Sequence, residues 1–106
     1  MAYHHFHLDK LTQFSLHLED LCADLLSWRD DVPAELVDEI AITAGEIMLL
    51  LADHSHDELV CGTLGDARRL REVARTLQPQ RAVLVEAGAA LTKEVAQIIR
   101  EEKQAS

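Results

Sequence analysis

Histidine is the residue type with the clearest capacity for chemistry in this chain, with six among 106 residues. If the fold is made of antiparallel helices, the start of the chain and residues 53–58 lie at the same end, which brings imidazoles and carboxylates together. Both groups are suitable ligands for Zn²⁺ or Ni²⁺. The possible ligands are His4, His5, His7, Asp9, Asp53, His54, His56, Asp57 and Glu58. No HxxxH or ExxH pair stands on a helix face, so we predict no metal and keep a metal-responsive bundle as an alternative.

Nucleophilic catalysis has less support in the sequence. Cys22 and Cys61 stand on or next to apolar stripes without an obvious histidine neighbour, and there is no glycine-rich phosphate loop. We expect both cysteines to be reduced, partly buried small residues. The pair Asp30-Asp31 is explained more simply as a turn and helix-start signal. We therefore predict a protein that is not an enzyme and needs no cofactor.

Charge is distributed unevenly along the chain. The formal net charge is −9, and residues 1–60 hold 13 acidic residues against only Lys10 and Arg29. A surface that binds nucleic acid needs clustered cations, so this balance argues against direct nucleic-acid binding. The one basic cluster comprises Arg68, Arg69, Arg71, Arg75 and Arg81. We interpret it as a solvated face that balances the acidic half, within one chain or between two, with phosphate contact as the alternative.

Composition and the ends of the chain favour a cytoplasmic globular domain. The chain has 48% hydrophobic and 27% charged residues, with 4 Gly and 2 Pro, which suits a few long elements. Its start lacks the basic and apolar regions of a secretory signal. The longest strongly apolar run, residues 47–52, is too short to cross a bilayer. We expect no membrane contact.

The elements that would position these groups are helices, because apolar residues recur at spacings of 3 and 4. The first helix should span about residues 6–29, with one buried face and one wet face. Its dimer or core seam comprises Leu11, Phe14, Leu18, Leu21, Leu25 and Trp28. Leu8, Cys22 and Leu26 widen this stripe.

Start signals divide the rest of the chain into three more helices. Pro33, after an acidic cap, should open a helix over about 33–53. Residues 55–58 fit a capping box that opens a helix over about 56–77, and Gly62 and Gly65 make a break near residues 61–65 plausible. Pro79 marks a helix over about 80–103, in which Gly88 permits close helix approach.

Four amphipathic helices with short joints predict an all-α fold in one domain over residues 1–106. The architecture is either an antiparallel up-and-down bundle or a helical array completed by homodimerisation.

The second predicted helix carries more apolar surface than its own core stripe uses. At 100° per residue, Ile42 and Leu49 fall opposite that stripe, on a back face shared with Asp38 and Gly45. Contiguous exposed apolar patches mark interaction sites. The predicted partner-binding residues are Tyr3, Phe6, Asp38, Ile42, Gly45 and Leu49. This surface could serve a second copy, a different protein or both, or could close a larger core.

Part of the sequence resembles a known family of regulators. Pro33-Ala34-Glu35-Leu36 opens an isoleucine-rich helix, and Cys61-Gly62 precedes a charged, leucine-spaced segment from Arg68. With the length and acidity of the chain, these features over roughly residues 33–91 resemble the small helical anti-activators of bacterial quorum sensing. Such proteins bind and inactivate LuxR-type transcription factors. The likeness is to those that bind LasR-like receptors and is fainter to the TraM type, from which the leucine-rich segment 8–28 departs.

The resemblance implies a cytoplasmic, dimeric, cofactor-free inhibitor that masks receptor surface needed for dimerisation or DNA contact. It transfers no receptor-contacting residue position by position, so the partner-binding set above rests on the helical periodicity alone. Besides the metal-responsive bundle, a small chaperone or immunity-type protein binding a basic client through its acidic face is the other alternative.

Overall fold

The computed structural model describes residues 8–28, 31–76 and 80–105, and most of these residues are in helices. The described residues form α1 (Leu8–Ser27), α2 (Ala34–Leu51), α3 (Glu58–Ala74) and α4 (Arg81–Ala105). One turn of 3-10 helix, η1 (Ala52–His54), follows α2. The all-α prediction is confirmed.

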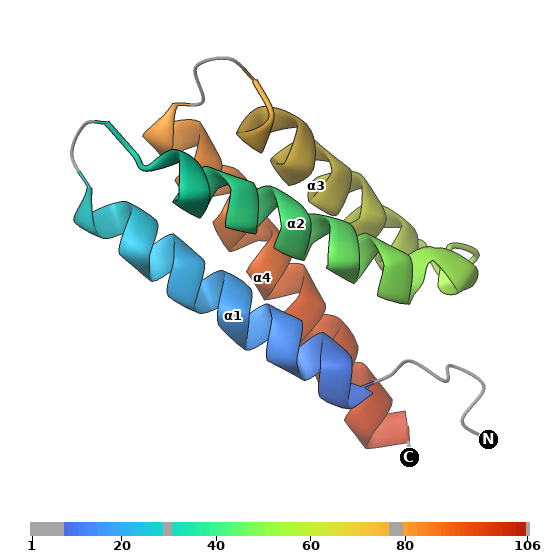
Figure 1. Cartoon of the computed structure of the whole chain (residues 1–106). Coiled ribbons are helices and arrows are strands. Elements are labelled where there is room, and N and C mark those ends of the chain that lie inside the picture. Colours follow the sequence, from blue (N-terminus) through green and yellow to red (C-terminus); the bar gives the residue numbers. More distant parts are fainter. Residues whose placement is uncertain (1–7, 29–30, 77–79, 106) are drawn as a thin grey trace.

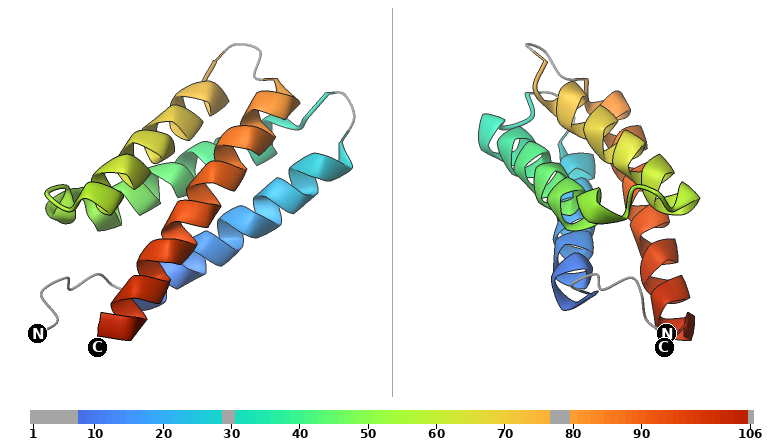
Figure 2. Two further views of the ribbon diagram at one scale, coloured as in Figure 1. Left: turned by 180° about the vertical axis from the view of Figure 1, so that it is seen from behind. Right: turned by 90° about the vertical axis from the view of Figure 1, so that its right-hand side faces the viewer.

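The four helices form an antiparallel up-and-down bundle (Figure 1). Each helix packs against the next one in the chain, and α4 returns to lie beside α1, which closes the ring (Figure 2). The bundle is elongated, with extents of 48 × 21 × 18 Å. The predicted bundle is confirmed, whereas homodimerisation stays a prediction.

Aliphatic side chains at helical spacing fill the core between the helices. The buried hydrophobic residues on the last three helices are Leu36, Val37, Ile40, Ala44, Ile47, Leu51, Val60, Ala67, Leu70, Ala74, Leu84, Ala87, Leu91, Val95 and Ile98. On α1, Leu11, Leu18, Leu21 and Leu25 are buried. Every helix therefore gives one face to a common core and leaves the other free.

The α1 seam differs from the sequence prediction at its last position. Phe14 is partly buried and packs against the core, and Ser15 next to it is buried. Trp28 lies one residue beyond the last residue of α1 and is 40% exposed, so the core part of the seam stops at Leu25. The prediction that Leu26 widens the buried stripe is also wrong, since its side chain is exposed.

Helix starts are set by two residues that the sequence identified only approximately. Pro33 is the N-cap of α2 rather than its first helical residue, and no side chain caps this end. At α3 the capping box is wrong: the N-cap is Asp57, whose carboxylate accepts hydrogen bonds from the backbone N–H of Leu59 at 2.9 Å and of Val60 at 3.3 Å. An aspartate one residue before the helix satisfies the same unpaired N–H groups that a serine would.

The glycines of α3 do not break it. The helix runs without interruption through Gly62 and Gly65, because neighbours on its buried face, such as Val60, Thr63 and Ala67, hold it against the core. Tertiary packing outweighs the weak helix propensity of two glycines here.

Gly88 permits the close approach of α4 to α1, as predicted. A Cβ atom at this position would lie 2.5 Å from the Sγ atom of Cys22 on α1. That separation is too short for a non-bonded contact, so a side chain at residue 88 would force either the Cys22 side chain or one of the helices to shift.

None of the helices in the described ranges is both long enough and apolar enough to cross a bilayer.

Candidate protein-binding groove

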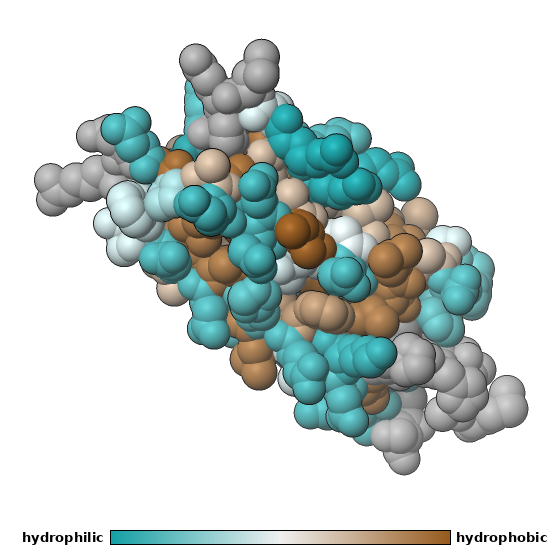
Figure 3. All heavy atoms as spheres, in the orientation of Figure 1, coloured by the Kyte–Doolittle hydropathy of each residue, from teal (hydrophilic) through white to brown (hydrophobic). Residues whose placement is uncertain are grey.

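A groove of about 820 Å³ runs along the outer surface between α2 and α3. Its floor is apolar, formed by small or partly buried side chains that include Ala41, Met48 and Leu64. Figure 3 shows apolar side chains gathered over α2, with hydrophilic side chains beside them on the α3 side. The groove thus joins an apolar centre to a polar border.

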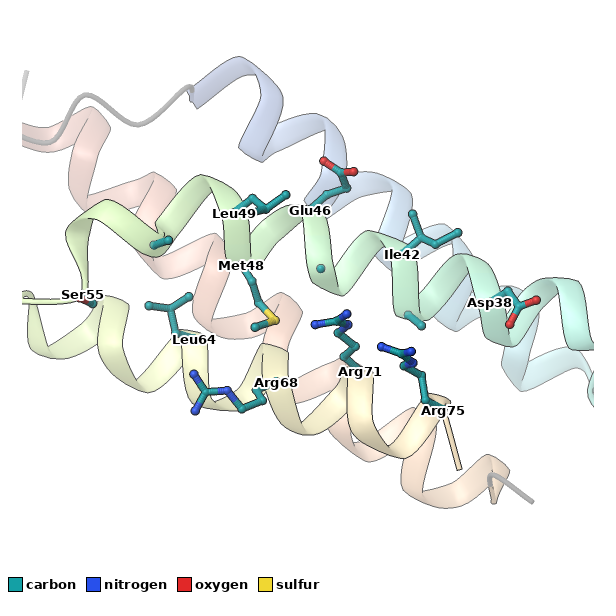
Figure 4. A pocket seen from close by; sticks show the side chains of 13 residues that line it. Asp38, Ile42, Glu46, Met48, Leu49, Ser55, Leu64, Arg68, Arg71 and Arg75 are labelled. Carbon is teal, nitrogen blue, oxygen red and sulfur yellow. The ribbon is translucent and has the colours of Figure 1, made fainter. Parts of the chain in front are cut away.

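Two large apolar side chains form the α2 lip of the groove. Ile42 is 57% exposed and Leu49 is 72% exposed, and both line the groove (Figure 4). They stand seven residues apart, or two helical turns, so they project from the same face of α2. They lie on the face opposite Ile40 and Ile47, which are buried in the core. The core of a single copy therefore does not cover this strip.

Three arginines form the α3 lip. Arg68, Arg71 and Arg75 follow Leu64 at spacings of four, three and four residues, which places the first three of these four residues on one stripe of α3, with Arg75 at the C-cap of the helix. Their side chains are exposed, and none of the three forms an ion pair with another described residue. Figure 4 shows Arg71 and Arg75 reaching from α3 toward α2.

Arg71 reaches across the groove to Gly45 on α2. A Cβ atom at this glycine would stand 4.0 Å from Nε of Arg71, which is an ordinary van der Waals contact. The Arg71 side chain therefore lies next to the stretch of α2 between Ile42 and Leu49. The groove therefore has positive charge between and beside its apolar anchors.

Two carboxylates complete the border on the α2 side. Asp38 and Glu46 line the groove, and neither is paired with a groove arginine at ion-pair distance. A smaller hollow of about 440 Å³ adjoins the groove at Asp38 and Arg75, which line both. The charges across the groove are opposite in sign, with cations on α3 and anions on α2.

The structure brings together the described part of the predicted partner-binding set. Asp38, Ile42, Gly45 and Leu49 all line this one groove. Tyr3 and Phe6 lie outside the described residues. Of the seam residues, the buried leucines serve the core of this chain, whereas Trp28 is partly exposed and away from the groove.

The second wall of the groove is not predicted by the sequence. The arginines were interpreted as a solvated face, because their distance from Ile42 in the sequence gives no sign of contact. The spacing of Leu64, Arg68, Arg71 and Arg75 was the available signal. It becomes informative once α3 is known to pack antiparallel beside α2.

The histidine cluster is only partly within the described residues. His4, His5 and His7 lie outside them, while the rings of His54 and His56 stand with centroids 6.4 Å apart. No group of three or more histidine, cysteine, aspartate or glutamate side chains is arranged to hold a metal ion within residues 8–28, 31–76 and 80–105.

The two cysteines differ in environment. Burial, and then the negative charge of Glu19, raises the pKa of the Cys22 thiol. That thiol stays protonated near neutral pH, which makes it a weak nucleophile. Cys61 is exposed on α3.

A separate polar cluster lies between α3 and α4. The hydroxyl of Thr63, which is buried, donates to the carbonyl of Leu59 at 2.8 Å and approaches Oε2 of Glu94 at 3.2 Å. Burial, and then a hydrogen bond and repulsion from Asp66, raise the pKa of Glu94 to about 7. This cluster is a titrating contact within the bundle and does not reach the groove.

Comparison of the chain with protein-family models, with curated proteins and with solved structures finds no match.

Proposed function

We propose that this protein is a non-enzymatic, protein-binding inhibitor that acts through the groove between α2 and α3. The observation that carries the proposal is the pair Ile42 and Leu49, which are exposed and line the groove. Large apolar side chains that remain exposed over an apolar floor gain free energy when a partner covers them. Residues at i and i+7 on one helix face are typical anchors of helix-mediated recognition.

The groove offers the features of a binding surface. It supplies apolar area at its centre and charged groups at its borders, the arrangement found in protein interfaces. Arginine is enriched at such interfaces because its planar head group stacks on apolar atoms and forms several hydrogen bonds.

We assign the partner to the LuxR-type transcription factors, of the LasR-like kind, because of the resemblance described above. In this role the protein works in the cytoplasm, as a homodimer, and blocks dimerisation or DNA binding of the receptor. It needs no cofactor and makes no direct contact with nucleic acid.

The experiment is co-purification of the chain with a LasR-like receptor, with and without the lactone ligand of the receptor. Wild-type chain should retain the receptor, and Ile42→Glu and Leu49→Glu should lose it, since each places a carboxylate within the apolar contact. Helical circular dichroism should be unchanged, because both side chains are outside the core.

The matched control is Leu16→Glu. Leu16 on α1 is 56% exposed, almost the same as Ile42, and it is not a groove residue. It should bind the receptor like wild type. The proposal fails if no LuxR-type receptor is retained, or if the control loses binding to the same extent as the groove variants.

A further inference from the structure

The charged borders of the groove restrict which partner fits it. The chain as a whole is acidic, with a formal net charge of −9, yet the α3 lip carries three exposed arginines without an ion-pair partner among the described residues. Within an acidic molecule, such a row is the place where an anionic partner is attracted and not repelled.

The dimensions of the groove match a helix. Its lining extends from Asp38 on α2 to Ala52, the first residue of η1, which is about 21 Å at 1.5 Å per residue. The side chains of α2 form a ridge along one side of the groove and those of α3 form a ridge along the other. A third helix can pack into the depression between two such ridges. A partner helix of about four turns would lie along it.

The spacing of the arginines also matches the repeat of a partner helix. Arg68, Arg71 and Arg75 recur every three or four residues, so they follow one edge of the groove at the pitch of a helix. Carboxylates spaced three or four residues apart on a helix lying in the groove would face them. Ile42 and Leu49 would meet the apolar stripe of that helix.

From this geometry we infer that the groove takes an amphipathic helix whose apolar stripe is flanked, on the edge facing α3, by a row of carboxylates. The inference rests on the proposed function and names the chemistry of the segment that the inhibitor captures. The arginine row fixes the rotation of the bound helix about its axis, and the apolar lip supplies the contact area.

Helix α1 of a second copy fits the groove less well than such a helix. The exposed apolar residues of α1 are Leu16 and Leu26, ten residues apart. That separation is about 15 Å along the axis and about 80° around it, so the two do not form one continuous stripe. The acidic outer face of α1 therefore lacks the apolar stripe that Ile42 and Leu49 require.

Two synthetic helical peptides of about 16 residues test the inference. Both carry the same apolar stripe at i, i+4, i+7 and i+11, and one edge holds either glutamates or lysines, with glutamine on the other edge. The glutamate peptide should bind about tenfold more tightly at about 20 mM salt, because three exposed ion pairs each contribute roughly twofold to threefold. Near 0.5 M salt the preference should shrink to less than about threefold.

Charge reversal in the chain should remove the preference. Arg71→Glu, and Arg68→Glu as a second variant, should bring the affinities of the two peptides within about twofold of each other. Arg100→Glu changes the net charge equally on exposed α4 surface and should keep the full preference. Ile42→Glu should weaken both peptides alike.

Equal affinity for the two peptides, no binding of either, or a preference that survives Arg71→Glu would overturn the inference. If Ile42→Glu blocks receptor binding while Arg71→Glu does not, the proposed function stands and the inference fails. If sedimentation shows a dimer that Ile42→Glu converts to monomer and that excess peptide does not disrupt, the groove is the contact between copies and the inference is also wrong.

Discussion

Replacing Gly88 by alanine tests the tight packing of α4 against α1 at Cys22. Two opposing effects act at this position. Alanine favours a helix interior over glycine by about 1 kcal/mol. The added methyl group, however, would stand 2.5 Å from the Sγ atom of Cys22, where no room exists for it.

The balance can be worked out from the geometry. Over-packing of a filled core costs about 1–3 kcal/mol, and the helix-propensity gain offsets about 1 kcal/mol of that. Gly88→Ala should therefore lower the free energy of unfolding by roughly 0–2 kcal/mol. In a Cys22→Ala background the obstructing sulfur is gone, so the same substitution should raise it by about 1 kcal/mol.

Urea unfolding of the two single variants and the double variant measures the coupling energy of this contact, which should be about 1–3 kcal/mol. Gly65→Ala is the matched control, because a Cβ atom at Gly65 meets nothing within 4 Å. This substitution should raise the free energy of unfolding by about 1 kcal/mol. If Gly88→Ala stabilises as much as Gly65→Ala in the wild-type background, α1 and α4 do not approach each other as described.

Three further predictions concern single groups. Because the pKa of Glu94 is raised to about 7 in the fold, above its usual 4.5, the folded state binds a proton more tightly than the unfolded chain does. The stability contributed by this group is present below pH 4.5 and is lost as pH rises from 4.5 to about 7, so Glu94→Gln should flatten that loss in urea midpoints measured over this range. Asp57→Ala removes the α3 cap and should lower the free energy of unfolding by about 1 kcal/mol, while Asp57→Asn should retain most of it. A maleimide should modify Cys61 at least about tenfold faster than Cys22 at pH 7, followed by peptide mass analysis, because Cys22 is partly buried with a raised pKa.

The fold could be predicted from the sequence because the spacing of the apolar residues indicates each helix. Ile40 and Ile47 fall on one face of α2 and Ile42 and Leu49 on the other, and the structure buries the first pair and exposes the second. Helical periodicity depends only on local geometry, so it can be worked out without knowing the neighbours.

The ends of the helices were harder to predict. Ser55 and Asp57 are both good N-cap residues, and in the structure it is Asp57 that accepts the N–H bonds of α3. Trp28 was placed on the core seam by extending a regular pattern past Ser27, where α1 ends. Periodicity states which face a residue occupies only for as long as the helix continues.

Only the α2 side of the groove could be predicted from the sequence. Ile42 and Leu49 stood out because apolar residues on a solvent face are unusual. The arginines did not stand out, because charged residues on a solvent face are expected. Their role depends on α3 lying beside α2, a tertiary relation that no local pattern in the sequence contains.

Both walls of the groove come from one helical hairpin, an uninterrupted stretch of chain from Asp38 to Arg75. Contacts between neighbouring helices close short loops, so this hairpin can assemble before α1 and α4 meet, and its formation does not wait for the most distant pairing. The outward side chains that line the groove also differ from the inward ones that fill the core. Under the proposed function, the specificity for a partner could therefore change in evolution, or be engineered, through substitutions in this one segment. Helices α1 and α4 would not need to change.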